Sequence, residues 1–216
     1  MGREADVTIE YRSKALYSLP MAAACLFALE VARLKGDQTV EPIIKSLYSL
    51  PPLLTKQYTD EEARARQLAE QYRDETLFYV LGTGPLWGLA YKFGLTVFME
   101  NMRLHGSFID AAEFRHGPAE MLDRHKPVIV ILKGTDDTRP MVERVQRIIE
   151  RAGAPTIVYD VADYSGVHPL LAPFVLKIPL QWFAVYSALL RGIEDLDERA
   201  LMGRGIMSQG EGITWP

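Results

Sequence analysis

The sequence predicts an α/β protein: a three-layer sandwich in which helices cover both faces of a five-stranded parallel sheet, preceded by a helical extension. Two observations predict this class. Apolar runs without polar alternation, such as LFYVLG at 77–82 and VIVILKG at 128–134, are typical of strands buried on both faces. Helical segments separate these runs, and a helix between two strands is the usual connection of a parallel pair.

The first segment, residues 1–74, is predicted to contain a remnant strand and helices. ADVTIEY at 5–11 favours a short strand. Pro51 and Pro52 are expected to end the second helix, because proline has no amide hydrogen to donate. Thr59 and Glu62 have the spacing of a capping box for the third. Helices are therefore expected at 15–34, 40–55 and 59–73.

The sheet domain is predicted to span 75–196. After the strand at 77–82 we expect a helix at 85–103 and a short extended piece near 107–112. The remaining elements, in order, are a strand at 128–134, a helix at 138–152, a strand at 156–161, a strand at 174–178 and a helix at 180–194. The glycine-rich residues 197–216 form a C-terminal tail.

Composition narrows the classes of function. The net charge is −4 without a basic block, and nucleic-acid backbones need clustered Lys and Arg, so nucleic acid is not expected as a partner. The single cysteine, Cys25, excludes an internal disulfide and a multi-cysteine metal site. Lys92 and Lys177 interrupt the longest apolar stretches, and no signal peptide is visible, so we expect no membrane span and a cytoplasmic protein.

The first candidate for chemistry is the glycine loop GTGPLWG at 82–88, which includes Gly82, Thr83 and Gly84. Free amide groups at a helix start favour an anion, although the same residues also suit a plain tight turn. A nicotinamide-binding loop would need an acid about 20 residues on, at the end of a second strand. Glu100 has that spacing but falls in a predicted helix, which disfavours a nicotinamide-dependent oxidoreductase.

The second candidate is Glu100 itself. Between Pro85 and Met99 only Lys92 is charged, so this helix is expected to be largely buried. A carboxylate on a partly buried apolar face would have a raised pKa, which suits a general base. The alternative is a solvated carboxylate at the end of the helix.

The third candidate is His116 in AEFRHGPAE at 112–120. It precedes a Gly-Pro pair that is typical of a helix start, and a histidine there can titrate near neutral pH. Glu113 is placed to orient the ring, and His105 follows the Glu100 helix closely enough to line the same pocket. The alternative is a surface histidine. No spacing of His, Cys or Asp indicates a metal site.

Together these pieces resemble the sugar isomerase (SIS) family. A strand and glycine loop lead into an apolar helix ending in Glu100, and the E-x-x-H-G-P element follows at 113–118. The stretch 75–205 is similar to the second SIS subdomain of the isomerase half of glucosamine-6-phosphate synthase, and more similar to the fructosamine-6-phosphate deglycases. The ending LDERALMGRG resembles the deglycase C-terminus, with Arg204 where that family carries a lysine.

The resemblance implies a flavodoxin-like fold and a phosphosugar substrate. It implies Glu100 as general base, His116 as the residue that assists ring opening, and Arg204 as a substrate contact. Ser18 stands where the family tends to carry a Thr-Lys pair and is the binding candidate of its segment. This chemistry needs neither a metal nor a redox cofactor. Deglycase and aldose–ketose isomerase would use the same pair, and a non-catalytic phosphosugar-binding module is the alternative class.

The resemblance also has a gap. The family normally has a first SIS subdomain whose Ser/Thr-rich loop holds the sugar phosphate, and no such loop occurs here. The opening READVTIEY resembles the last strand of that subdomain. We therefore expect either a fragment of a two-subdomain protein or a shortened member. The apolar faces of the N-terminal helices predict a homo-oligomer.

Overall fold

The computed structural model describes residues 6, 8, 17–196, 198 and 201. The strand expected at 5–11 and the candidate Arg204 therefore lie outside the described residues, apart from positions 6 and 8. The chain forms two compact units, 1–48 and 49–216. The first contains α1 (Ser18–Leu34) and the first residues of α2 (Val40–Asp60), and the second contains the sheet.

The expectation that Pro51 and Pro52 end the second helix was wrong, because α2 runs through both prolines to Asp60. A proline removes one backbone hydrogen bond, and two in succession leave the carbonyls of residues 47 and 48 without helical donors. The boundary between the two units falls at this weakened turn. The capping box is not formed either: α3 (Glu62–Gln71) begins without a side-chain cap.

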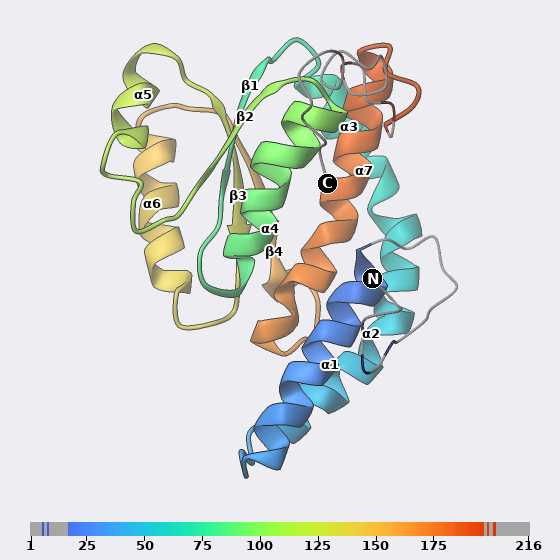
Figure 1. Ribbon diagram of the computed structural model, residues 1–216. Coiled ribbons are helices and arrows are strands. Elements are labelled where there is room, and N and C mark those ends of the chain that lie inside the picture. The colour runs from blue at the N-terminus through green and yellow to red at the C-terminus, as the bar shows by residue number, and fades with distance from the viewer. Residues whose placement is uncertain (1–5, 7, 9–16, 197, 199–200, 202–216) are drawn as a thin grey trace, which may run out of the picture. The chain divides into compact units, whose positions relative to one another are not determined.

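The sheet has four parallel strands in the order β2-β1-β3-β4 (Figure 1). The central strand β1 pairs in parallel with β2 on one side and with β3 on the other, so the two apolar runs lie in one parallel sheet as predicted. The connection after β1 leads to β2 on one side and the connection after β3 leads to β4 on the other, so a topological switch point lies between β1 and β3. The strands are β1 (Leu77–Leu81), β2 (His105–Ile109), β3 (Val128–Lys133) and β4 (Thr156–Asp160).

The prediction of a fifth strand at 174–178 was wrong: the described residues form four strands, and this segment belongs to α7 (Ala172–Leu190). Length and composition of a short apolar run do not separate a buried strand from a buried helix. Pro179 lies inside α7 and cannot donate to the carbonyl of Val175. The side chain of Gln57 replaces that donor, with Nε2 at 3.2 Å from the Val175 oxygen.

Helices cover both faces of the sheet, as predicted (Figure 1). One apolar core lies between the sheet and α3, α4 and α7, and includes Phe78, Phe98 and Phe183. The other lies between the sheet and α5 (Pro118–Arg124) and α6 (Arg139–Arg151). One described helical stretch, Pro169–Leu190, is long and apolar enough to cross a membrane, but 67% of that window is buried, which fits a core helix.

The helix predicted at 85–103 is present as three consecutive segments. These are a 3₁₀ turn (Gly84–Leu86), α4 (Trp87–Tyr91) and a π-helical segment, η2 (Lys92–Asn101). The segment η2 presses against β2 at Gly94, where an added Cβ would lie 2.5 Å from the carbonyl oxygen of Ser107. Gly106 faces the same contact, 2.3 Å from the Gly94 oxygen for an added Cβ. These two glycines therefore fix how closely the helix carrying Glu100 approaches the edge strand.

We predict that Gly94→Ala lowers the free energy of unfolding by about 1–3 kcal/mol, because the new methyl group meets backbone atoms that cannot rotate away. Gly88→Ala is the matched control on the same helix: an added Cβ there has no neighbour within 4 Å, and φ is not positive. The control is expected to raise stability by about 0.5–1 kcal/mol. Urea denaturation measures both, and equal stability of the two variants would contradict the close contact.

Candidate functional site

A cavity of about 370 Å³ lies beside the edge strand β2, toward the carboxyl ends of the strands. Parallel α/β sheets bind ligands at this edge. Its wall combines aromatic side chains with carboxylates and an imidazole. They include Tyr79, Trp87, Phe108, Asp110, Glu113 and His116. Two of the predicted site residues, Glu113 and His116, are thus brought together in one concave surface.

The loop between β2 and α5 carries His116. Asp110 holds the start of this loop by accepting hydrogen bonds from the Ala112 amide at 2.9 Å and from the Thr83 hydroxyl at 3.0 Å. His116 is exposed, and its Nε2 accepts a hydrogen bond from Arg115 Nε at 3.0 Å. A neutral imidazole that accepts at Nε2 carries its proton on Nδ1. The ring therefore presents one N–H donor for a ligand.

The glycine loop after β1 forms a tight turn with close protein contacts. An added Cβ on Gly82 would lie 2.9 Å from the Leu86 carbonyl oxygen. Gly84 has φ +55°, and an added Cβ there would lie 3.0 Å from Asp136 Oδ1. Thr83 is buried and donates a hydrogen bond to Asp110, so it helps to hold the start of the loop that carries His116. None of the three lines the cavity, and substrate binding by them stays a prediction.

Glu100 lies at the other end of β2. It is near the C-terminus of η2, five residues before β2 begins, whereas His116 follows the end of β2 by seven residues. Glu100 is exposed, so the partial burial expected for it is not found in the single chain. His105, which opens β2, is exposed at the same end as Glu100. Ser18, the first residue of α1, belongs to the other compact unit.

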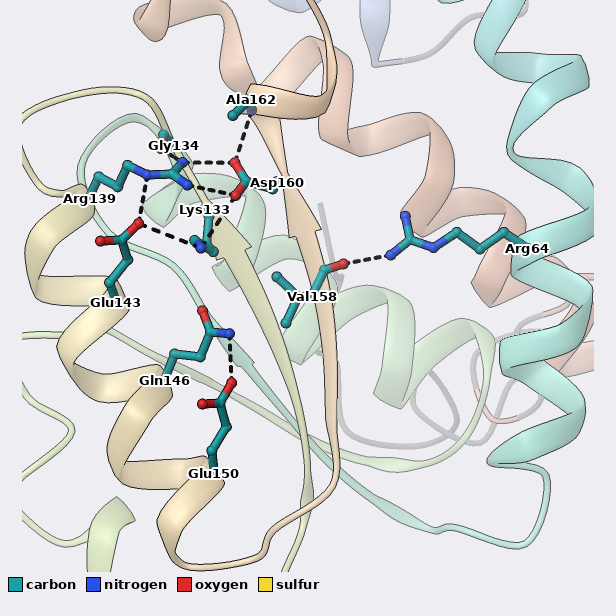
Figure 2. Close-up of polar contacts among 10 residues, drawn as sticks. All are labelled: Arg64, Lys133, Gly134, Arg139, Glu143, Gln146, Glu150, Val158, Asp160 and Ala162. Atoms are coloured by element: carbon teal, nitrogen blue, oxygen red, sulfur yellow. Dashed lines mark hydrogen bonds and ion pairs between the residues drawn. The ribbon is translucent and has the colours of Figure 1, made fainter.

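A network of charged side chains at the ends of β3 and β4 was not predicted from the sequence (Figure 2). Arg139 binds Asp160 through two hydrogen bonds of 2.8 and 2.7 Å, and also binds Glu143 and the Gly134 carbonyl at 2.8 Å. Lys133 adds a contact of 3.4 Å to Asp160. Burial alone would raise the pKa of Asp160, but the hydrogen bonds from Arg139 outweigh it and lower the pKa to about 2.

This network holds the loop after β3, whose Asp136 and Thr138 side chains occupy the space that a Cβ on Gly84 would enter. It therefore stiffens the carboxyl edge of the sheet next to the helix of Trp87. A signal was present: Asp160 ends an apolar strand, and Arg139 opens the helix that follows the neighbouring strand. Among the described residues, no three His, Cys, Asp or Glu side chains are placed to hold a metal ion.

The relatives found by sequence comparison are enzymes named for 6-phosphorylated sugars. No protein-family model matches the chain. The chain is 31% identical to fructoselysine 6-phosphate deglycase of Escherichia coli over 92% of its own length and 58% of that protein. It is 27% identical to glutamine–fructose-6-phosphate aminotransferase (isomerizing) of Thermus thermophilus, over 88% of this chain and 33% of that protein.

The fold has a solved counterpart. A crystal structure of a Bacillus subtilis protein assigned to the phosphosugar isomerases matches with a TM-score of 0.79 and 28% identity, over 93% of this chain and 64% of that one. The chain thus spans about three fifths of the length of the Escherichia coli deglycase and of the Bacillus subtilis protein.

Proposed function

Since the chain belongs to the sugar isomerase (SIS) family, we propose that it binds a phosphosugar and forms part of a cytoplasmic fructosamine-6-phosphate deglycase, or of an aldose–ketose isomerase acting on a phosphosugar. The observation that carries this proposal is the cavity at the carboxyl edge of the sheet, where His116 and Glu113 meet an aromatic wall. Its volume of about 370 Å³ suits a monosaccharide derivative. The similarity to a fructoselysine 6-phosphate deglycase favours the deglycase reaction.

In the proposed reaction, His116 donates a proton during opening of the sugar ring of a 6-phosphorylated ketoamine. Glu100 removes a proton from C1, which gives an enaminol. Reprotonation at C2 produces an imine at C1, and water adds to that imine and releases glucose 6-phosphate and the amine. An isomerase would use the same base to move a proton between C1 and C2 without losing an amine.

The geometry supports a site built from two copies of the chain. Glu100 and His116 lie beyond opposite ends of β2, a strand of five residues that spans about 13 Å. A single sugar cannot contact both in one chain. A two-fold axis beside the edge strand would turn a second chain end for end, so that Glu100 of one copy approaches His116 of the other.

An apolar stripe on the same helix supports that arrangement. Trp87, Tyr91 and Met99 are each more than 40% exposed and follow one another at multiples of four residues. The rings of Trp87 and Tyr91 stack with their centroids 5.6 Å apart. A homodimer that covers this stripe would bury it beside Glu100 and would exclude water from the carboxylate proposed as the base.

The function is tested with the protein as its gene encodes it, assayed with a panel of fructosamine 6-phosphates that differ in the amine. We expect release of glucose 6-phosphate together with an equal amount of amine. Interconversion of a ketose and an aldose phosphate without amine release would identify the isomerase instead. Calorimetric binding of a phosphosugar without any turnover would identify a non-catalytic module and contradict the proposed reaction.

A further inference from the structure

A second cavity, of about 320 Å³, lies on the opposite side of the sheet from α6, where α2 ends, α3 begins and the chain leaves the short helix η3 (Val161–Asp163). All of its lining residues belong to the second compact unit. None of them takes part in the reaction proposed above. Three of its eight lining residues are carboxylates, Asp60, Glu61 and Asp163.

The strongest indication of a ligand is the side chain of Gln57. It is 2% exposed and lines the cavity. Its Nε2 is committed to the Val175 carbonyl, which Pro179 leaves without a helical donor. Its Oε1 is buried and has no hydrogen-bond partner. An unsatisfied buried amide oxygen is costly, so this atom calls for a donor from outside the protein.

The hydroxyl of Tyr164 does not supply that donor. Tyr164 lies beside the Gln57 amide and donates its proton to Glu61 Oε1. Burial, followed by this hydrogen bond to Glu61, raises the pKa of Tyr164 far above its ordinary value, so the phenol stays protonated and bound to the carboxylate. The donor position at Gln57 Oε1 is therefore left for a ligand.

The net negative charge of the cavity wall indicates which kind of hydrogen-bond donor the ligand carries. Asp60, Glu61 and Asp163 line the cavity together with a single lysine, Lys56, which lies 3.5 Å from Asp60. Arg64 is 3.8 Å from Glu61 and donates to the Val158 carbonyl at 2.7 Å (Figure 2). The carboxylates thus outnumber the cations, and the Asp163 side chain is exposed at the cavity. A cationic ligand is favoured.

We propose that this cavity binds a small organic cation that carries primary ammonium groups on an aliphatic stem. Among the described residues these carboxylates are not placed to hold one metal ion together, which favours a ligand that carries more than one charged group. One ammonium group would bind between Gln57 Oε1 and Glu61, and a second would reach Asp163. Leu53 supplies an apolar surface for the stem. The inference does not rest on the proposed function.

The test is isothermal titration of the whole protein with 1,5-diaminopentane at low ionic strength. We expect saturable binding of one molecule per chain. Glu61→Gln keeps an acceptor for Tyr164 but removes the charge, and Asp163→Asn removes the charge of an exposed side chain at the end of η3. Each is expected to weaken binding about tenfold. Glu70→Gln, an identical charge change on α3 outside the cavity, should leave the affinity unchanged.

Equal weakening in all three variants would show diffuse attraction of a dication and overturn the site. Diaminopentane binding is also measured in potassium chloride and in a salt of a bulky organic cation at the same ionic strength. Stronger inhibition by potassium chloride would show that the site prefers a simple inorganic cation, and would overturn the proposed organic ligand. Asp163→Asn keeps the test valid if Glu61→Gln fails to fold, because Asp163 is exposed. Glu100→Gln should bind diaminopentane normally, so failure of the proposed reaction and failure of this site are distinguishable.

Discussion

Glu100→Gln is expected to lower the rate of glucose 6-phosphate release by about 10²–10⁴-fold, because the amide cannot accept the C1 proton. The amide has almost the shape of the carboxylate, so the phosphosugar should bind with nearly unchanged affinity. Coupled assay of glucose 6-phosphate measures the first effect, and calorimetry measures the second. A loss of kcat without a comparable change of Kd would identify proton transfer as the missing step.

Glu150→Gln is the matched control, since Glu150 is an exposed carboxylate on α6, away from β2 and from the site. It is expected to retain full turnover. Wild-type rates in Glu100→Gln would remove Glu100 from the mechanism. Equal losses in the two variants would point to a general effect of charge on the enzyme.

Mixing two inactive variants is expected to restore activity if the site is shared between two chains. Glu100→Gln and His116→Asn homodimers each lack one residue in both sites. Subunit exchange at equal concentrations gives one half heterodimers, each with one site mutated twice and one site intact. The mixture should therefore recover about a quarter of wild-type activity.

The control mixes Glu100→Gln with a chain that carries both substitutions. In that heterodimer every site lacks at least one residue, so no activity should return. Sedimentation and mass measurement verify that the chains have exchanged. Verified exchange without recovered activity would contradict a site shared between two chains.

The sequence predicted strands β1 and β3 correctly, because the pattern of these two segments fits a buried strand and no other element. The runs at β1 and β3 have no polar alternation and end in glycine, and they are adjacent parallel strands. Prediction failed at α7, because an apolar segment buried on every side has no periodicity that separates strand from helix. It failed again at Pro51 and Pro52, where a helix tolerates prolines whose lost hydrogen bonds are limited to two carbonyls.

The candidate site shows the same division. Sequence alone found His116 and Glu113, because a histidine before Gly-Pro on a loop is a local pattern, and the structure places both on one cavity. It could not place Glu100 relative to them, since that depends on the direction in which the helix crosses the sheet. The expected burial of Glu100 was wrong for the single chain, where the end of the helix is exposed.

The amino-acid sequence by itself therefore determined the family, the parallel α/β class and the identity of the candidate residues, because each of these is encoded in neighbouring positions. The tertiary structure decided what depends on residues far apart in the chain. Folding places Arg139 against Asp160. It also places the Gln57 amide at the Val175 carbonyl, 118 positions away in the chain. Glu100 and His116 are separated by the length of β2. Such contacts leave no local pattern, since only packing of helices on the sheet creates them.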